Sequence, residues 1–239
     1  MKLFRQRKKE IEDTSDQIIG GFAFFLSLAF LLPTGCTFLL VALMQVRHSD
    51  LTAITTFIAA LSVGIFIAHY GINGHLSVLI HEWKHQVVSS LVGNKNKRME
   101  VNQLSGSLQY EYTKATAHYN AFIALAPYIL PVFTLIGAMI SFALGATSTW
   151  LPLIIIGTCY GIDLLMNVRD ISPVQTDINL IRGGYSIGVL YIIAWNALTS
   201  GITLAWAFNG LDGIAEQFGT IAKIFIRLYS VLTGWQPGS

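Results

Sequence analysis

The sequence has 239 residues, of which 53% are hydrophobic and only 12% are charged, and its mean hydropathy is +0.57. Soluble domains carry about 25% charged residues, so this composition excludes an ordinary soluble enzyme and indicates a chain that crosses a membrane several times. The net charge of +2 is too small to predict a nucleic-acid partner, because the basic residues stand at segment ends, where they set membrane topology.

The chain begins with a basic and then acidic stretch, residues 1–16, that has no apolar periodicity. We expect a cytoplasmic tail and not a signal peptide, because the apolar segment that follows is too long for one. That segment, about 18–46, is interrupted by Pro33 and predicts one long tilted or kinked transmembrane helix. Cys36 and Cys159 both lie inside apolar segments, so they predict neither a disulfide framework nor a cysteine zinc cluster.

Further apolar segments bring the expected number of transmembrane helices to about six; they cover about 51–69, 75–92, 119–144, 150–168 and 178–208. Residues 93–114 are polar, and partial alternation of apolar and polar residues around Gly106 predicts a β-hairpin. An apolar period in 211–239, with Lys223 and Arg227 beside it, predicts an interfacial helix. The predicted fold class is therefore an all-α polytopic membrane protein with a short membrane-associated β-hairpin.

Four ionisable residues within five positions interrupt the apolar segment 75–92: His81, Glu82, Lys84 and His85. Charges inside a membrane cost about 2.5 to 3.5 kcal/mol each on insertion scales and usually mark a function. Residues four apart share a helix face, so both imidazoles can bind one zinc ion. Glu82 then stands beside the first ligand, where it can take a proton from a metal-bound water and deliver it to the leaving amine. The motif predicts a zinc metalloprotease.

Two other interpretations of this segment concern its place in the membrane. It could lie at the interface as an amphipathic helix whose ionisable residues are solvated. Lys84 lies off the histidine face, and we expect it to snorkel to the lipid headgroups. The spacings of His69 and His75 from His81 do not fit a one-turn ligand pair, so we expect both to be interfacial or core residues.

A catalytic zinc ion needs a third protein ligand, and a carboxylate commonly joins two histidines. The candidates are Asp163, Asp170, Asp177 and Asp212. We favour Asp177, because it directly precedes the last long apolar segment, where a helix start would present it to the membrane interior. Asp163 lies mid-segment, where it could bond a neighbouring helix or line the same cavity, and Asp212 is expected to cap the terminal helix.

These residues resemble the site-2 protease family of intramembrane zinc metalloproteases. That family pairs H-E-x-x-H on one transmembrane helix with an aspartate on a later one, in a stretch resembling N-x-x-P followed by L-D-G. The first element is matched in full. In the second, Asn167, Pro173 and Asp177 follow the family's order with altered spacing, and Ile178 stands where glycine is usual. Asp212 has the letters L-D-G but not the membrane context.

The resemblance also implies roles for residues after the metal-binding helix. The family tends to place there a β-hairpin that receives substrate as an added strand, which unwinds the scissile amide, and Met99–Tyr112 falls in that place. A following stretch similar to the family's A-G-P keeps Ala126 and Pro127 without the glycine. His118 and Asn120 at its entrance could donate to a substrate carbonyl or its oxyanion. An ordinary polar loop and interfacial caps are the alternatives.

We therefore predict an intramembrane zinc metalloprotease with Zn²⁺ as cofactor, His81, His85 and Asp177 as metal ligands and Glu82 as general base. Its expected partners are the lipid bilayer and a membrane protein or peptide substrate, and no nucleic acid. The expected parts are a cytoplasmic tail (1–16), a transmembrane zinc metalloprotease domain (17–208) and a C-terminal interfacial amphipathic helix (209–239). The chain is compatible with a bacterial plasma (inner) membrane.

The main alternative is a metal-binding membrane transporter or a non-proteolytic regulator that uses the same histidine pair. Transport sites usually combine discontinuous helices and several carboxylates, whereas a single cluster with Glu82 between its histidines favours water activation. A di-iron desaturase or hydroxylase would need more clustered histidines than the six present. Other membrane zinc proteases use a later glutamate as third ligand, and Glu100, Glu111 and Glu216 are poorly placed for that.

Overall fold

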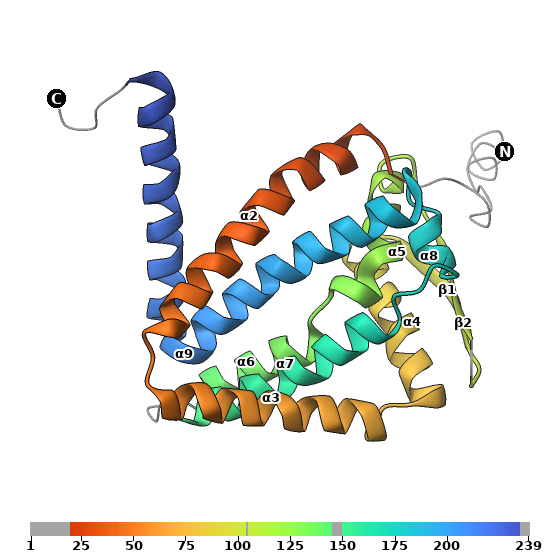
Figure 1. Cartoon of the computed structure of the whole chain (residues 1–239). Helices are drawn as coiled ribbons and strands as arrows, with labels where there is room; N and C mark the ends of the chain where they lie inside the picture. The colour runs from red at the N-terminus through yellow and green to blue at the C-terminus, as the bar shows by residue number, and fades with distance from the viewer. Residues whose placement is uncertain (1–19, 104, 145–149, 235–239) are drawn as a thin grey trace, which may run out of the picture. The chain divides into compact units, whose positions relative to one another are not determined.

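A computed structural model describes residues 20–103, 105–144 and 150–234 of the chain (Figure 1). The predicted cytoplasmic tail, residues 1–16, lies outside this part. The described elements are α2 (Phe22–Arg47), α3 (Leu51–Gly71), α4 (Gly74–Leu91), β1 (Lys95–Val101), β2 (Gly106–Glu111), η3 (Ala117–Tyr119), α5 (Asn120–Ile129), α6 (Val132–Ala143), α7 (Trp150–Arg169), α8 (Thr176–Asn179) and α9 (Gly184–Thr233).

Within the described residues, α2, α3, α7 and α9 are long and apolar enough to cross a membrane. Two further segments, Ala117–Ile129 and Val132–Ala143, meet at a bend of 70° and count as a fifth span if they cross together. This confirms the prediction of an all-α polytopic membrane protein with a β-hairpin. The number of spans by this measure is four to five, against about six expected, because the ionisable residues of α4 make that helix too polar to be counted.

The chain forms two compact units. The first comprises Met1–Phe30, of which residues 20–30 are described, together with Phe66–Leu130 and Leu164–Ile193. The second comprises Leu31–Ile65, Pro131–Asp163 and Ala194–Ser239. The first unit therefore contains the H-E-x-x-H motif, the hairpin and two of the four candidate aspartates.

In the first unit, the hairpin follows α4 directly. Strands β1 and β2 are antiparallel, and their register runs from Lys95 opposite Glu111 to Val101 opposite Gly106, with an irregularity after Asn96. The observed hairpin thus begins at Lys95, a few residues before Met99, where the resemblance placed its start. Both strands and α5 contact α4, so the hairpin lies beside the helix that carries the two histidines (Figure 1).

In the second unit, close helix contacts depend on small residues. A Cβ atom at Gly64 would collide with the backbone of α7, and one at Gly161 would collide with the backbone of α3. Small residues allow such backbone contact in membrane helices, where lipid offers no hydrophobic drive for association. The mid-segment Asp163 is 1% exposed and accepts hydrogen bonds from the backbone N–H and the hydroxyl of Thr134, at 2.7 and 2.9 Å. Asp163 thus caps the first turn of α6.

Helix α9 contains a break at Gly210, where φ is +62° and ψ is −146°, so two helical pieces meet there. Asp212 follows this break and is exposed. In the second piece, the buried side chain of Gln217 donates to the carbonyl oxygen of Phe38 at 2.7 Å. The separate C-terminal helix at the membrane interface stays a prediction.

Candidate metal centre

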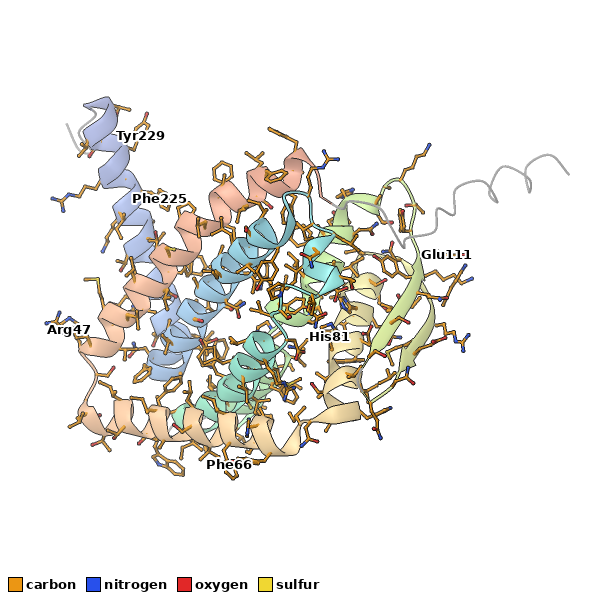
Figure 2. All side chains as sticks on the ribbon, turned by 45° about the vertical axis from the view of Figure 1, so that its right-hand side comes forward. Arg47, Phe66, His81, Glu111, Phe225 and Tyr229 are labelled. Carbon is orange, nitrogen blue, oxygen red and sulfur yellow. The ribbon has the colours of Figure 1, made fainter. Side chains whose placement is uncertain are left out.

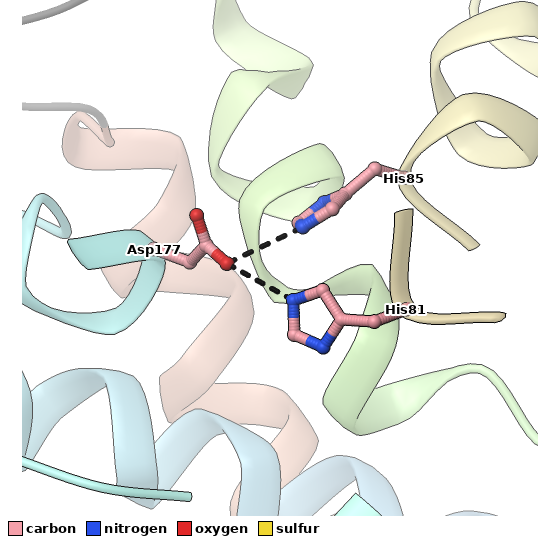
Figure 3. Close-up of side chains that lie close together, drawn as sticks. All are labelled: His81, His85 and Asp177. Carbon is pink, nitrogen blue, oxygen red and sulfur yellow. Dashed lines mark hydrogen bonds and ion pairs between the residues drawn. The ribbon is translucent and has the colours of Figure 1, made fainter. Parts of the chain in front are cut away.

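The two histidines of α4 lie one helical turn apart and both face α8. Their ring centroids are 5.1 Å apart, and Figure 2 labels His81 on the side of α4 toward α8. The Nε2 atoms of His81 and His85 each lie 3.3 Å from the same oxygen, Oδ2 of Asp177 (Figure 3). The structure therefore brings together the three residues that the sequence proposed as metal ligands.

The donor set fits a zinc ion. One nitrogen or oxygen atom from each of His81, His85 and Asp177 lies within 4.8 Å of the others. Two imidazoles and a carboxylate form the ligand set of many catalytic zinc sites, with bond lengths of about 2.0 to 2.2 Å. Tetrahedral ligands at those bond lengths stand about 3.3 Å apart, which is the separation of Asp177 Oδ2 from both Nε2 atoms.

Each imidazole is held by a second contact at its other nitrogen. Nδ1 of His85 donates to the carbonyl oxygen of Ile123 at 2.6 Å, and Nδ1 of His81 donates to Oδ2 of Asp170 at 3.2 Å. Contacts of this kind fix the tautomer and the ring orientation of metal-binding histidines and raise their basicity. Asp170, an alternative third ligand in the sequence, is therefore placed behind His81 instead.

Asp170 is itself anchored by the end of α7. The guanidinium of Arg169 lies 3.6 Å from Oδ1 of Asp170 and donates to the carbonyl oxygen of Ile72 at 2.7 Å and to the hydroxyl of Ser77. These contacts join the end of α7 to the connection before α4. The carboxylate behind His81 is thereby fixed relative to the helix that carries the histidines.

Asp177 lies in the short helix α8, and the residue that follows it, Ile178, is fully buried. Ile178, which stands where the resemblance suggested glycine, is 0% exposed and contacts Gly188 of α9 so closely that a Cβ there would collide with it. This apolar anchor holds the first turn of α8 against the unit. Burial opposes ionisation of the Asp177 carboxyl, but the neighbouring imidazoles of His85 and His81 hold its pKa well below its usual range.

Glu82 lies in the same cavity as the three candidate ligands. The cavity has a volume of about 510 Å³, and its wall includes Ser105 to Leu108 of the hairpin, Tyr110, Asn120 and Gln175. Glu82 is 6% exposed, and the backbone of Gly106 lies so close that a Cβ there would be 2.5 Å from Cγ of Glu82 and 2.6 to 2.8 Å from its carboxyl group. Strand β2 therefore covers the glutamate beside the candidate metal ligands.

The structure separates the two polar residues predicted at the entrance of α5. Asn120 is 5% exposed and lines the cavity, and its Oδ1 has no hydrogen-bond partner among the described residues. His118 is exposed and contacts the ring of Tyr119 in a tilted arrangement, with ring centroids 4.0 Å apart. His69 and His75 are also exposed, as expected for residues outside the ligand pair.

Sequence reasoning missed Tyr128. Its side chain is 0% exposed, and its ring meets the His81 ring edge-on, with centroids 5.5 Å apart. Tyr128 therefore packs against the imidazole of His81, a candidate metal ligand. The only sequence signal was an aromatic residue directly after Pro127, which by itself does not indicate a place beside a histidine on another helix.

A family model described as Peptidase M50B-like matches residues 68–223, more than half of the chain. The match spans α4, the hairpin, α5 to α8 and most of α9. No curated protein and no solved structure matches the chain.

Proposed function

The chain belongs to the Peptidase M50B-like family of site-2 protease type metallopeptidases, and on that premise we propose that it is a zinc-dependent intramembrane endopeptidase. The observation that carries this proposal is the meeting of His81, His85 and Asp177 in one cavity with the buried carboxyl group of Glu82. Such a site combines a zinc ligand set with an acid–base residue. The substrate would be a transmembrane or membrane-proximal segment of a protein or peptide.

His81, His85 and Asp177 would hold the zinc ion. A bound zinc ion lowers the pKa of a water to about 7 and polarises a substrate carbonyl. The two imidazoles are kept in position by Ile123 and Asp170, so little reorganisation is needed when the ion binds.

Glu82 would act as the general base and then as the general acid. It takes a proton from the attacking water as the new carbon–oxygen bond forms, and passes that proton to the nitrogen of the leaving amine as the peptide bond breaks. Its burial beside Gly106 excludes bulk water from the carboxylate, which strengthens its interaction with a nearby positive charge. Positioned acid–base groups of this kind contribute about 10² to 10⁴ in rate.

Asn120 would hold the substrate peptide in the cavity. Its buried Oδ1 can accept a hydrogen bond from a substrate N–H, while Nδ2 can donate to a substrate carbonyl oxygen. A donor at the carbonyl is most useful if it meets the oxyanion that forms during attack. This role follows from the side chain's place in the cavity wall, which His118 does not share.

Strand β2 would receive the substrate as an added strand. The hairpin has two strands in the described part, so β2 has one edge without a strand partner, and its first residues line the cavity. An extended peptide paired at that edge would gain main-chain hydrogen bonds and would present its amides to the site. A helical transmembrane substrate must be unwound locally for this to occur.

The decisive experiment measures zinc content and peptide cleavage on detergent-purified protein. We expect one zinc ion per chain in the wild type, loss of zinc in His81→Ala and Asp177→Ala, and retained zinc without cleavage in Glu82→Gln. The exposed Asp212 offers a matched control, since Asp212→Ala should keep both properties. Absence of zinc in metal-replete wild type would refute the proposal, and zinc binding without cleavage of any membrane peptide would favour the non-proteolytic alternative.

A further inference from the structure

Lys84 is buried within the first unit, on the helix that presents both histidines. Its side chain is only 1% exposed, so the expectation that it snorkels to lipid headgroups is wrong. A buried lysine nitrogen is costly unless polar groups take up its hydrogen bonds. The reason for its burial therefore lies in its partners on other elements.

Nζ of Lys84 donates hydrogen bonds to the carbonyl oxygen of Pro127 at 3.2 Å and to Oδ1 of Asn167 at 3.0 Å. The carbonyl is available because the residue four positions later, Pro131, has no N–H to donate to it. Helix α5 ends at Ile129, and a cation near the C-terminal end of a helix also interacts favourably with the helix dipole. The lysine replaces the helical donor that the proline removes.

The two partner elements are the ones that orient the imidazoles. Helix α5 carries Ile123, whose carbonyl accepts from His85, and α7 leads directly into Asp170, which accepts from His81. Lys84 joins α4 to both of these elements at once. If the distances from α4 to these two elements changed, the groups that accept hydrogen bonds from Nδ1 of both histidines would move together.

We propose that Lys84 is a positioning residue of the metal centre, whose bonds to Pro127 and Asn167 hold α4 at the spacing from α5 and α7 that both imidazoles need. Lys84 lies off the face of α4 that carries the histidines, so it acts through these elements and not on the substrate. The inference rests on the metal-binding part of the proposed function, and it is independent of peptide hydrolysis.

The test compares metal binding in variants of the full chain in detergent. Zinc affinity is measured by competition with a chelator, and ligand geometry by the visible absorption spectrum of the cobalt(II)-loaded protein. Lys84→Met keeps the aliphatic stem and should bind zinc about tenfold to a hundredfold more weakly, with an altered cobalt spectrum. Lys84→Gln keeps an N–H donor and should recover part of the affinity.

Ser89→Ala is the matched control. Ser89 is another buried polar residue of α4, but its hydroxyl donates to Oδ1 of Asn96 in β1, at 2.7 Å, and not to a residue of α5 or α7. It should lower thermal stability without changing zinc affinity or the cobalt spectrum. A purely structural role for Lys84 predicts the same behaviour for Lys84→Met, which would overturn the proposal.

Asn167→Leu provides a second variant if Lys84→Met does not fold. It removes the side-chain acceptor and leaves the carbonyl of Pro127, so zinc affinity should fall below that of the wild type. Where Lys84→Met does fold, this fall should be smaller than in Lys84→Met, and the double variant should be no weaker than Lys84→Met alone. Wild-type affinity and spectrum in Asn167→Leu would also overturn the proposal. Wild-type protein that binds zinc but cleaves no peptide would refute the proposed hydrolysis while leaving this comparison valid.

Discussion

The backbone of Gly106 lies directly against the carboxyl group of Glu82: a Cβ atom at Gly106 would be 2.6 Å from Oε1. Contacts this short are not found in folded proteins, so either the glutamate or the hairpin must move if residue 106 has a side chain. Because Glu82 is the proposed general base, a change at Gly106 of β2 should alter the position of the group that transfers the proton.

Gly106→Ala should therefore lower peptide cleavage by at least about tenfold while leaving zinc bound, because the added methyl displaces the proposed base from a position that contributes about 10² to 10⁴ in rate. The measurement is cleavage of a membrane peptide at matched zinc content. Gly71→Ala serves as the control, since a Cβ there would meet nothing within 4 Å. Full activity in Gly106→Ala would mean that Glu82 does not need its present position.

Asp170 and Asp177 should differ in their effect on metal binding. Asp177→Asn should abolish stable zinc binding, because this carboxylate faces Nε2 of both histidines. Asp170→Asn should keep one zinc per chain at saturating metal but weaken the affinity about tenfold to a hundredfold, because it only orients His81. Chelator competition distinguishes the two. The opposite pattern would exchange the roles of the two aspartates.

The free edge of β2 should be needed for substrate but not for zinc. The backbone N–H of Asn102 donates to the carbonyl oxygen of Ser105 at 2.8 Å, so these two residues form a hydrogen-bonded pair. Hydrogen-bonded and non-hydrogen-bonded pairs alternate along an antiparallel hairpin, which makes Met99 and Leu108 a non-hydrogen-bonded pair. The N–H of Leu108 therefore points away from β1. Leu108→Pro removes this outward donor, and Leu108→Ala removes the side chain only. We expect cleavage to be at least about tenfold slower in Leu108→Pro than in Leu108→Ala, at equal zinc content. Equal rates would count against strand addition at this edge.

Tyr110 should make the folded state lose stability at high pH. Burial, together with the charges of Tyr112 and Asp177, raises the pKa of the Tyr110 phenol to about 12, whereas an unfolded chain has a tyrosine pKa of about 10. The unfolded state therefore releases this proton first, and the stability contribution is complete below pH 10 and is lost as the pH rises toward 12. Thermal unfolding in detergent should show a smaller loss between pH 10 and 12 in Tyr110→Phe than in the wild type. An identical loss would contradict the shift.

The helical fold and the histidine pair could be predicted because both depend on local pattern. Apolar segments of spanning length indicate helices by themselves, and two histidines four apart share a face in any helix. The count of spans was less predictable, because α4 combines the length of a span with the polar residues of a site. The hairpin was predicted from alternation, but its start at Lys95 depends on pairing with Glu111.

The roles of the four aspartates could not be separated by pattern, because they depend on contacts between distant residues. Asp170 is 89 residues from His81 and Asp177 is 96 residues from it, and both reach the same imidazole. Asp163 instead caps α6 through Thr134, 29 residues away. Helix ends and short connections decide such contacts, and their geometry follows from packing rather than from spacing along the chain.

The sequence by itself determined that this is a polytopic helical membrane protein with H-E-x-x-H on one helix, because hydropathy and a four-residue spacing act locally. Only the tertiary structure decided that Asp177 faces both histidines, that Asp170 stands behind His81, and that Lys84 is buried against Pro127 and Asn167. Those contacts join α4 to α5, α7 and α8. They arise only when the packing of the first unit satisfies buried polar groups that no single helix can satisfy alone.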